Sequence, residues 1–228
     1  MSLPIPNHIR ANRLVVAAHR SPMPARIAIA ATVAYWLLSA AVVIVNPQWN
    51  PLTRQLSEYA LARHGWLQVA AFLALALAYG MLTIAVRTST RGLAGRIGLV
   101  ILLVCTLGSA GVGVFVTDPM TTSPDQLTTR GLLHTAFGGG ALILLPIAAL
   151  LITRSIARNH QPRTPRRRHL YRLALLPLAG LLLIWVPEAA GLIPAGGWPD
   201  RVLFLAYTAW VIALATSHST PLDIEKGG

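Results

Sequence analysis

Six long apolar runs separated by polar connections constrain the fold of this chain more than any other feature. Each run is longer than the ~10 residues that a strand of a membrane barrel needs, and most approach the ~20 apolar residues that carry a helix across a bilayer. We therefore expect an all-α fold, a polytopic membrane helical bundle of six transmembrane helices. The runs cover residues 27–45, 66–86, 97–116, 132–152, 173–190 and 202–215, the last extended by Thr216 and Ser217.

Charged residues lie mainly between the runs and make up only 11% of the chain, less than half of the ~25% found in soluble domains. Of the 19 Lys and Arg residues, fifteen lie in the two tails and in the connections after the second and fourth runs. The other connections hold the remaining four. Since cytoplasmic connections are enriched in Lys and Arg, we expect an N-in and C-in protein of the inner (cytoplasmic) membrane.

The basic residues that give the net charge of +12 are densest in RTPRRRHLYR, residues 163–172. No nucleic-acid-reading motif accompanies this segment, which argues against a nucleic-acid partner. Basic segments next to transmembrane helices contact anionic headgroups. We therefore expect membrane lipids as partners and no nucleic acid.

The polar connections also predict the organisation of the chain. Residues 1–26 are expected to form a basic cytoplasmic tail, 27–217 the six-helix transmembrane domain, and 218–228 a cytoplasmic C-terminal tail. In the long connection after the first run, Leu52, Leu56 and Tyr59 recur at helical spacing. This spacing predicts a short amphipathic helix near 51–63 at the outer interface.

Small residues at intervals of four mark the third and fourth runs. Ser109 and Gly113 have this spacing in the third run, and Gly131, Thr135 and Gly139 continue it around the start of the fourth. Small residues allow the backbones of two membrane helices to approach closely. We therefore predict a tight contact between these two helices near the outer leaflet.

Ionisable residues approach the hydrocarbon mainly at the predicted outer end. Glu188 lies fifteen residues into the fifth run, about 22 Å from its cytoplasmic start. Asp118 follows the third run, His134 lies one turn into the fourth beside Arg130, and Glu58 belongs to the interfacial segment. Because ionisable groups within membrane segments are costly and often functional, these five residues are the candidate site.

Two interpretations of this polar layer remain open. The first is a structural network in which Glu58 pairs with Arg54 or Arg130 and Asp118 closes a turn. The second is a site, either a pocket that binds a ligand or an acid/base pair acting on a lipid or isoprenoid substrate. A catalytic zinc site usually has three protein ligands with histidine prominent, and His64 is the one other histidine expected on this side. We therefore expect no metal and no cofactor.

Three segments resemble successive signatures of the bacterial membrane proteins grouped as domain of unknown function 998. They are LSEYALARHGWLQVAAFLALAL (56–77), GVGVFVTDP (111–119) and TTRGLLHTAFGG (128–139). The resemblance covers residues 27–215 and implies a six-helix membrane protein. It implies no activity, and it suggests as characteristic positions Ser57, Glu58, Gly65, Asp118, Pro119 and His134.

The sequence thus favours an integral membrane protein with an outward-facing polar pocket near the outer leaflet that binds a lipid or small molecule. The residues expected to bind the ligand are Glu58, Asp118, Arg130, His134 and Glu188. The alternative is a membrane-embedded enzyme with Glu188, Asp118 and His134 as catalytic candidates. A small-molecule transporter is a second alternative, disfavoured because no inverted repeat is evident.

Overall fold

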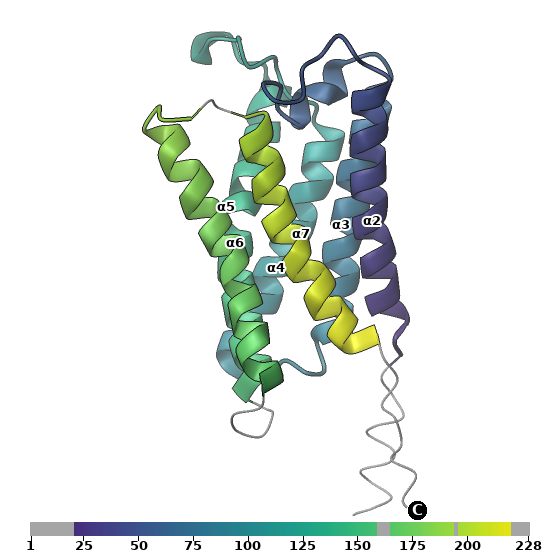
Figure 1. Cartoon of the computed structure of the whole chain (residues 1–228), viewed down its shortest axis with the longest axis vertical. Coiled ribbons are helices and arrows are strands. Elements are labelled where there is room, and N and C mark those ends of the chain that lie inside the picture. The colour runs from purple at the N-terminus through teal and green to yellow at the C-terminus, as the bar shows by residue number, and fades with distance from the viewer. Residues whose placement is uncertain (1–20, 159–164, 194–195, 220–228) are drawn as a thin grey trace, which may run out of the picture.

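A computed structural model describes residues 21–158, 165–193 and 196–219, and within these ranges six helices are long and apolar enough to cross a membrane (Figure 1). This confirms the predicted six-helix bundle, and the chain is a multi-pass membrane protein. The predicted tails 1–26 and 218–228 lie mostly outside the described residues. The helices are α2 (Met23–Ile44), α3 (Trp66–Val86), α4 (Gly92–Val114), α5 (Thr129–Arg158), α6 (Pro165–Ala189) and α7 (Trp198–Ser219).

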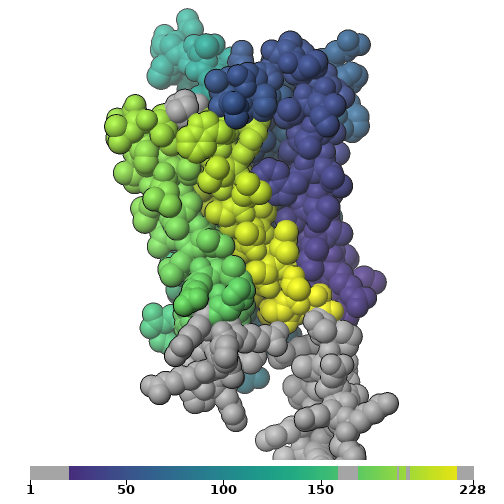
Figure 2. All heavy atoms as spheres, viewed as in Figure 1, coloured from purple at the N-terminus to yellow at the C-terminus, as the bar shows by residue number. Residues whose placement is uncertain are grey.

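The six helices form a closed ring in chain order. Each helix packs against the next one, and α7 closes the ring by packing against α2. Figure 2 shows α2, α7 and α6 side by side on one face of the bundle. Inside the ring, Tyr207 donates a hydrogen bond to the Leu142 carbonyl oxygen at 2.6 Å, and the Trp210 indole donates to Thr153 at 3.3 Å. Both aromatic side chains therefore bury their rings and still satisfy their polar atoms.

Large apolar side chains cover the outside of the bundle. Leu37, Leu107 and Leu183 are among the most exposed of them. A water-soluble protein rarely exposes apolar side chains over such a continuous area, whereas hydrocarbon tails solvate them without cost. The exposed surface therefore fits a bundle dissolved in lipid.

The contact between α4 and α5 is the most extensive in the bundle, which confirms the predicted pairing of the third and fourth spans. Its close approach depends on glycines other than those expected. Gly108 packs against Ala141 and the Phe137 backbone, and Gly111 packs against the Phe137 ring, with no room for a side chain at either position. Gly113 instead faces α3, because it lies on another side of the helix.

Residues 45–65 and 115–128, with the described part of 190–197, form the end of the bundle that is uppermost in Figure 1, here called the upper end. The assignment of this end to the outer side of the membrane stays a prediction. Where a helix was expected near 51–63, the structure has turns followed by a five-residue 3-10 helix, η1 (Ser57–Leu61). A second 3-10 helix, η2 (Pro124–Gln126), precedes α5.

The segment 45–65 folds back on itself because Tyr59 packs inward rather than along a membrane surface. Its hydroxyl donates to the Trp49 carbonyl oxygen at 3.2 Å, and the two rings lie 5.4 Å apart. Leu56 and Tyr59 are buried, whereas Leu52 is exposed. The apolar residues of this segment therefore do not form one continuous face.

Two glycines bring the connection before α7 against this segment. Gly196 and Gly197 have φ of +75° and +69°, and Gln55 and the Leu52 carbonyl leave no room for a Cβ at either position. The Trp198 amide also donates to the Leu52 carbonyl oxygen at 3.2 Å. Because these conformations suit glycine, the first turn of α7 lies directly beside residues 52–55.

Candidate functional site

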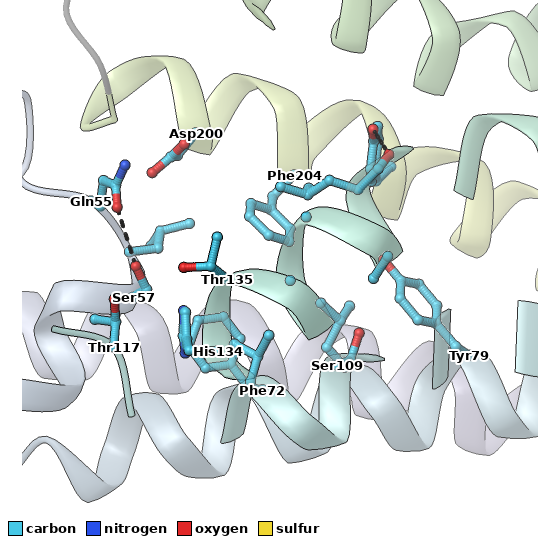
Figure 3. A pocket seen from close by; sticks show the side chains of 18 of the residues that line it. Gln55, Ser57, Phe72, Tyr79, Ser109, Thr117, His134, Thr135, Asp200 and Phe204 are labelled. Atoms are coloured by element: carbon cyan, nitrogen blue, oxygen red, sulfur yellow. Dashed lines mark hydrogen bonds between the residues drawn. The ribbon is translucent and has the colours of Figure 1, made fainter. Parts of the chain in front are cut away.

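A cavity of about 360 Å³ lies inside the ring below the upper end (Figure 3). Its walls come from α3, α4, α5 and α7, with one residue of α6, Trp185, and it is bounded above by residues 55–57 and Thr117. Five helices and two connections thus contribute to one site. No local stretch of sequence contains it.

Most of the polar side chains of the cavity lie in its upper part. Figure 3 shows Gln55, Ser57, Thr117, His134 and Asp200 toward one end, whereas Phe204, Ser109 and Tyr79 lie toward the other. The rest of the lining is mainly apolar and includes Phe72, Leu75, Val112 and Leu142. The cavity therefore has a strongly polar end and a mainly apolar end.

His134 is the one of the five predicted site residues that lines this cavity. It lies in the second turn of α5, is 8% exposed, and its ring meets that of Phe72 edge to face. Its Nδ1 lies 2.7 Å from the Phe115 carbonyl oxygen. Since a carbonyl oxygen only accepts, Nδ1 is the donor, and a neutral ring then presents Nε2 as an acceptor.

Asp200 is the acidic residue of the cavity, and it is not among the five site residues predicted from the sequence. It lies in the first turn of α7, with the Leu56 amide near its carboxylate. The neighbouring Arg201 does not pair with it, because its Nη1 donates to the carbonyl oxygens of Arg54 and Gly197 at 3.0 and 2.8 Å.

A sequence signal for Asp200 did exist. The motif WPD precedes the last apolar run, and an acidic residue after a proline is typical of the first turn of a helix. The sixth apolar run begins at residue 202, so the sequence predicts Asp200 in a connection. For Ser57 the signal was the family resemblance, which suggests it as a characteristic position. Gln55, Thr117 and Thr135 carry no such signal, because neutral polar residues are common near the ends of spans.

Glu58 lies at the upper end but not in the cavity. It is 2% exposed and accepts hydrogen bonds from the Met120 amide at 3.1 Å and from Arg54 at 3.2 Å. It therefore connects segment 45–65 to segment 115–128. This geometry corresponds to the structural interpretation, with Arg54 as the partner.

Asp118 also holds the upper end together. Its carboxylate accepts from the Thr128 amide at 2.7 Å and from the Thr128 hydroxyl at 2.9 Å. That hydroxyl in turn accepts from the Gly131 amide at 3.0 Å, which makes Thr128 the N-cap of α5. A carboxylate at this position also interacts favourably with the helix dipole.

The last two predicted residues lie near the cavity without lining it. Glu188 is half-buried near the end of α6, within electrostatic range of the Asp200 carboxylate. Arg130 is exposed and donates to the Val114 carbonyl oxygen at 3.4 Å. The structure therefore does not bring Glu58, Asp118, Arg130, His134 and Glu188 together around one cavity.

The chemistry available at the site is that of hydrogen bonding beside an apolar wall. Within the described ranges, no three His, Cys, Asp or Glu side chains come together as metal ligands. The acidic residue and the imidazole of the cavity are accompanied by one amide and six hydroxyl groups, which donate and accept. Such a lining suits a molecule with a polar head and an apolar body.

Comparisons with known proteins give one match. The model of the family described as "Protein of unknown function (DUF998)" matches residues 29–217. No curated protein and no solved structure matches the chain.

Proposed function

The chain belongs to the DUF998 family, whose description states no activity, and we propose that it binds a lipid-like amphiphile in the cavity below its upper end. The observation that carries the proposal is the cavity itself, with an acid, an imidazole and an amide at one end and mainly apolar residues along the rest. In the predicted orientation, this end faces the outer side of the cytoplasmic membrane. The proposal therefore names a binding protein rather than an enzyme.

The size and lining of the cavity support this proposal. Its volume of about 360 Å³ lies in the ~300–1,000 Å³ range of small-molecule sites, which are typically apolar with a few polar groups. Phe72, Leu75, Val112 and Phe204 supply the apolar wall. An entirely polar molecule would leave this wall without a partner.

The polar end indicates what the head of the ligand carries. The Asp200 carboxylate accepts hydrogen bonds, as does Nε2 of a neutral His134. Gln55, Ser57 and Thr117 add groups that both donate and accept. Because acceptors are prominent among these groups, we propose a head with hydroxyl or amine donors.

Two observations favour binding over the alternatives. Catalysis by Glu188, Asp118 and His134 requires them to meet at one reacting atom, whereas two of the three lie outside the cavity. Transport requires a path through the ring, whereas Leu102, Leu145 and Trp210 are almost fully buried. Their side chains fill the interior of the ring.

Native mass spectrometry of the protein released from membranes tests the proposal. The wild-type protein is expected to retain one lipid-like molecule. Leu142→Trp places an indole in the cavity and should remove this molecule, whereas Leu144→Trp, on the same helix but outside the lining, should keep it. Both variants must show the wild-type melting temperature. A wild-type protein without a bound molecule, or equal retention by both variants, would overturn the proposal.

A further inference from the structure

We infer that the ligand enters the cavity sideways from the bilayer, through an opening between the upper halves of α5 and α6. This lateral opening is defined by Thr135 and Gly139 of α5 and Trp185 of α6, which all line the cavity. The inference rests on the proposed binding function. It adds the route of entry and, from it, the class of ligand.

The exposure of the lining residues locates the opening. On α3, the lining residues Phe72, Leu75 and Tyr79 are almost fully buried, as are Ser109 and Val112 of α4. These two helices therefore form a closed wall.

On the opposite side, the lining residues are accessible. Thr135 is exposed, Gly139 is half-buried, and Trp185 is 55% exposed. A residue that lines a cavity and is also exposed on the surface marks the point where the two are continuous. The cavity is therefore continuous with the surface between α5 and α6.

The glycines of α5 show that α6 does not cover this point. A Cβ at Gly139 or at Gly140 would meet no atom within 4 Å. Lower in the bundle, by contrast, Gly180 of α6 packs closely against Ala206 and Leu203 of α7. Trp185 lies more than one turn above this contact, so the upper part of α6 is the part adjacent to the opening.

The surroundings of the opening identify the phase that it faces. Exposed Leu132 and Ile143 flank it on α5, and exposed Leu182, Leu183 and Val186 flank it on α6. No charged residue occurs in 131–153 of α5 or in 173–187 of α6. Charged groups are avoided where a helix faces hydrocarbon, so the opening faces lipid tails rather than water.

A lateral route restricts the ligand to molecules that dissolve in the bilayer. Its apolar chain lies at the level of Gly139 and Trp185, and its head reaches Asp200 and His134. A cavity of about 360 Å³ accommodates one chain. The geometry therefore points to a single-chain amphiphile with a hydroxyl or amine head, such as a monoacyl lipid or an isoprenoid alcohol, taken directly from the membrane.

Cysteine labelling in proteoliposomes tests the route without the ligand. Cys105, the one cysteine of the chain, is replaced by Ala, and Ser109→Cys places a reporter thiol on the closed α4 wall of the cavity. Two reagents are compared, N-phenylmaleimide, which partitions into lipid, and a charged sulfonatoethyl methanethiosulfonate, which does not. Each rate is divided by the rate with free cysteine.

Lateral entry predicts a normalised rate at least tenfold higher for N-phenylmaleimide. Gly139→Phe should lower that rate at least fivefold, and the matched control Gly140→Phe should leave it unchanged, because Gly140 has the same free space but does not line the cavity. Circular dichroism melting establishes that both variants fold.

Three results would overturn the route. They are faster labelling by the charged reagent, equal effects of the two phenylalanine variants, and a thiol that neither reagent reaches. If Leu142→Trp still removes a co-purified molecule in these cases, the binding function stands and the molecule enters from the upper end. If no molecule co-purifies, the binding function fails whatever the labelling shows.

Discussion

Substitution of Gly131 by alanine is predicted to destabilise the protein, although glycine-to-alanine changes in helices usually stabilise it. A Cβ at this position would overlap the carboxylate of Asp118. That carboxylate accepts the two hydrogen bonds from Thr128, and Thr128 caps α5 through the Gly131 amide. The methyl group therefore displaces the acid that orients the cap.

The expected magnitude follows from the bonds that are lost. Hydrogen bonds to a charged group contribute ~1.5–3 kcal/mol when well formed, and Asp118 is half-exposed, so we take about 2 kcal/mol for the pair. The interaction with the helix dipole adds ~0.3–1 kcal/mol. Alanine recovers at most ~1 kcal/mol of helix propensity. Gly131→Ala should thus lower the free energy of unfolding by about 1–2 kcal/mol.

Gly140→Ala is the matched control on the same helix. A Cβ there meets nothing within 4 Å, so the variant should be more stable by ~0.5–1 kcal/mol. The two substitutions should therefore have opposite signs. Reversible unfolding in mixed micelles with increasing dodecyl sulfate, followed by circular dichroism, measures both.

A double-mutant cycle decides whether Asp118 is the cause. In an Asp118→Ala background the collision with the carboxylate is absent, so Gly131→Ala should become neutral or slightly stabilising. The reasoning is refuted if Gly131→Ala costs the same with and without the Asp118 carboxylate. It is also refuted if Gly131→Ala stabilises the wild-type protein as Gly140→Ala does.

Three further predictions concern the connections. Gly197→Ala should destabilise the protein by ~1–3 kcal/mol, because Gly197 has a φ of +69° and faces the Leu52 carbonyl. Gly191 has a similar φ of +68° but open space around it, so an equal loss of stability for Gly191→Ala would refute the collision with Leu52 as a cause. Ser155→Ala should lower the free energy of unfolding by ~1–3 kcal/mol in the same assay, because the Ser155 hydroxyl accepts from the Arg91 amide at 2.8 Å and donates to the Arg91 carbonyl oxygen at 2.6 Å. An unchanged free energy of unfolding would contradict this prediction. Burial raises the pKa of the Tyr59 hydroxyl above its usual value of about 10. The stability that the neutral hydroxyl contributes is therefore complete below pH 10 and is lost as the pH rises through the raised pKa. Tyr59→Phe should lessen this alkaline loss of stability, and an unchanged dependence of stability on pH would contradict the prediction.

The prediction of the spans succeeded because membrane insertion depends on the local sequence. A run of ~20 apolar residues crosses the bilayer as a helix whatever its neighbours are. The pairing of α4 with α5 was predicted for a related reason, since small residues permit close approach. The contacting glycines were partly wrong, because the rotation of a helix is set by all of its neighbours together. Gly113 accordingly faces α3.

The candidate site was predicted less well than the fold. The sequence indicates that Glu58, Asp118 and His134 lie near one end of the bundle, but it does not indicate what each side chain contacts. Glu58 and Asp118 bind backbone amides of the connections, and His134 alone of the predicted set lines the cavity. Asp200 lines the cavity because Gly196 and Gly197 allow the start of α7 to pack against residues 52–55.

The number of spans, their approximate bounds and the grouping of Glu58, Asp118 and His134 at one end of the bundle could all be predicted from the amino-acid sequence. These properties are local, because each residue contributes its own transfer free energy between water and lipid. The tertiary structure alone decided where a cavity lies, which polar side chains reach it and where it is open. A cavity is the space that several helices leave unfilled, so it depends on the volumes and rotations of side chains far apart in the sequence.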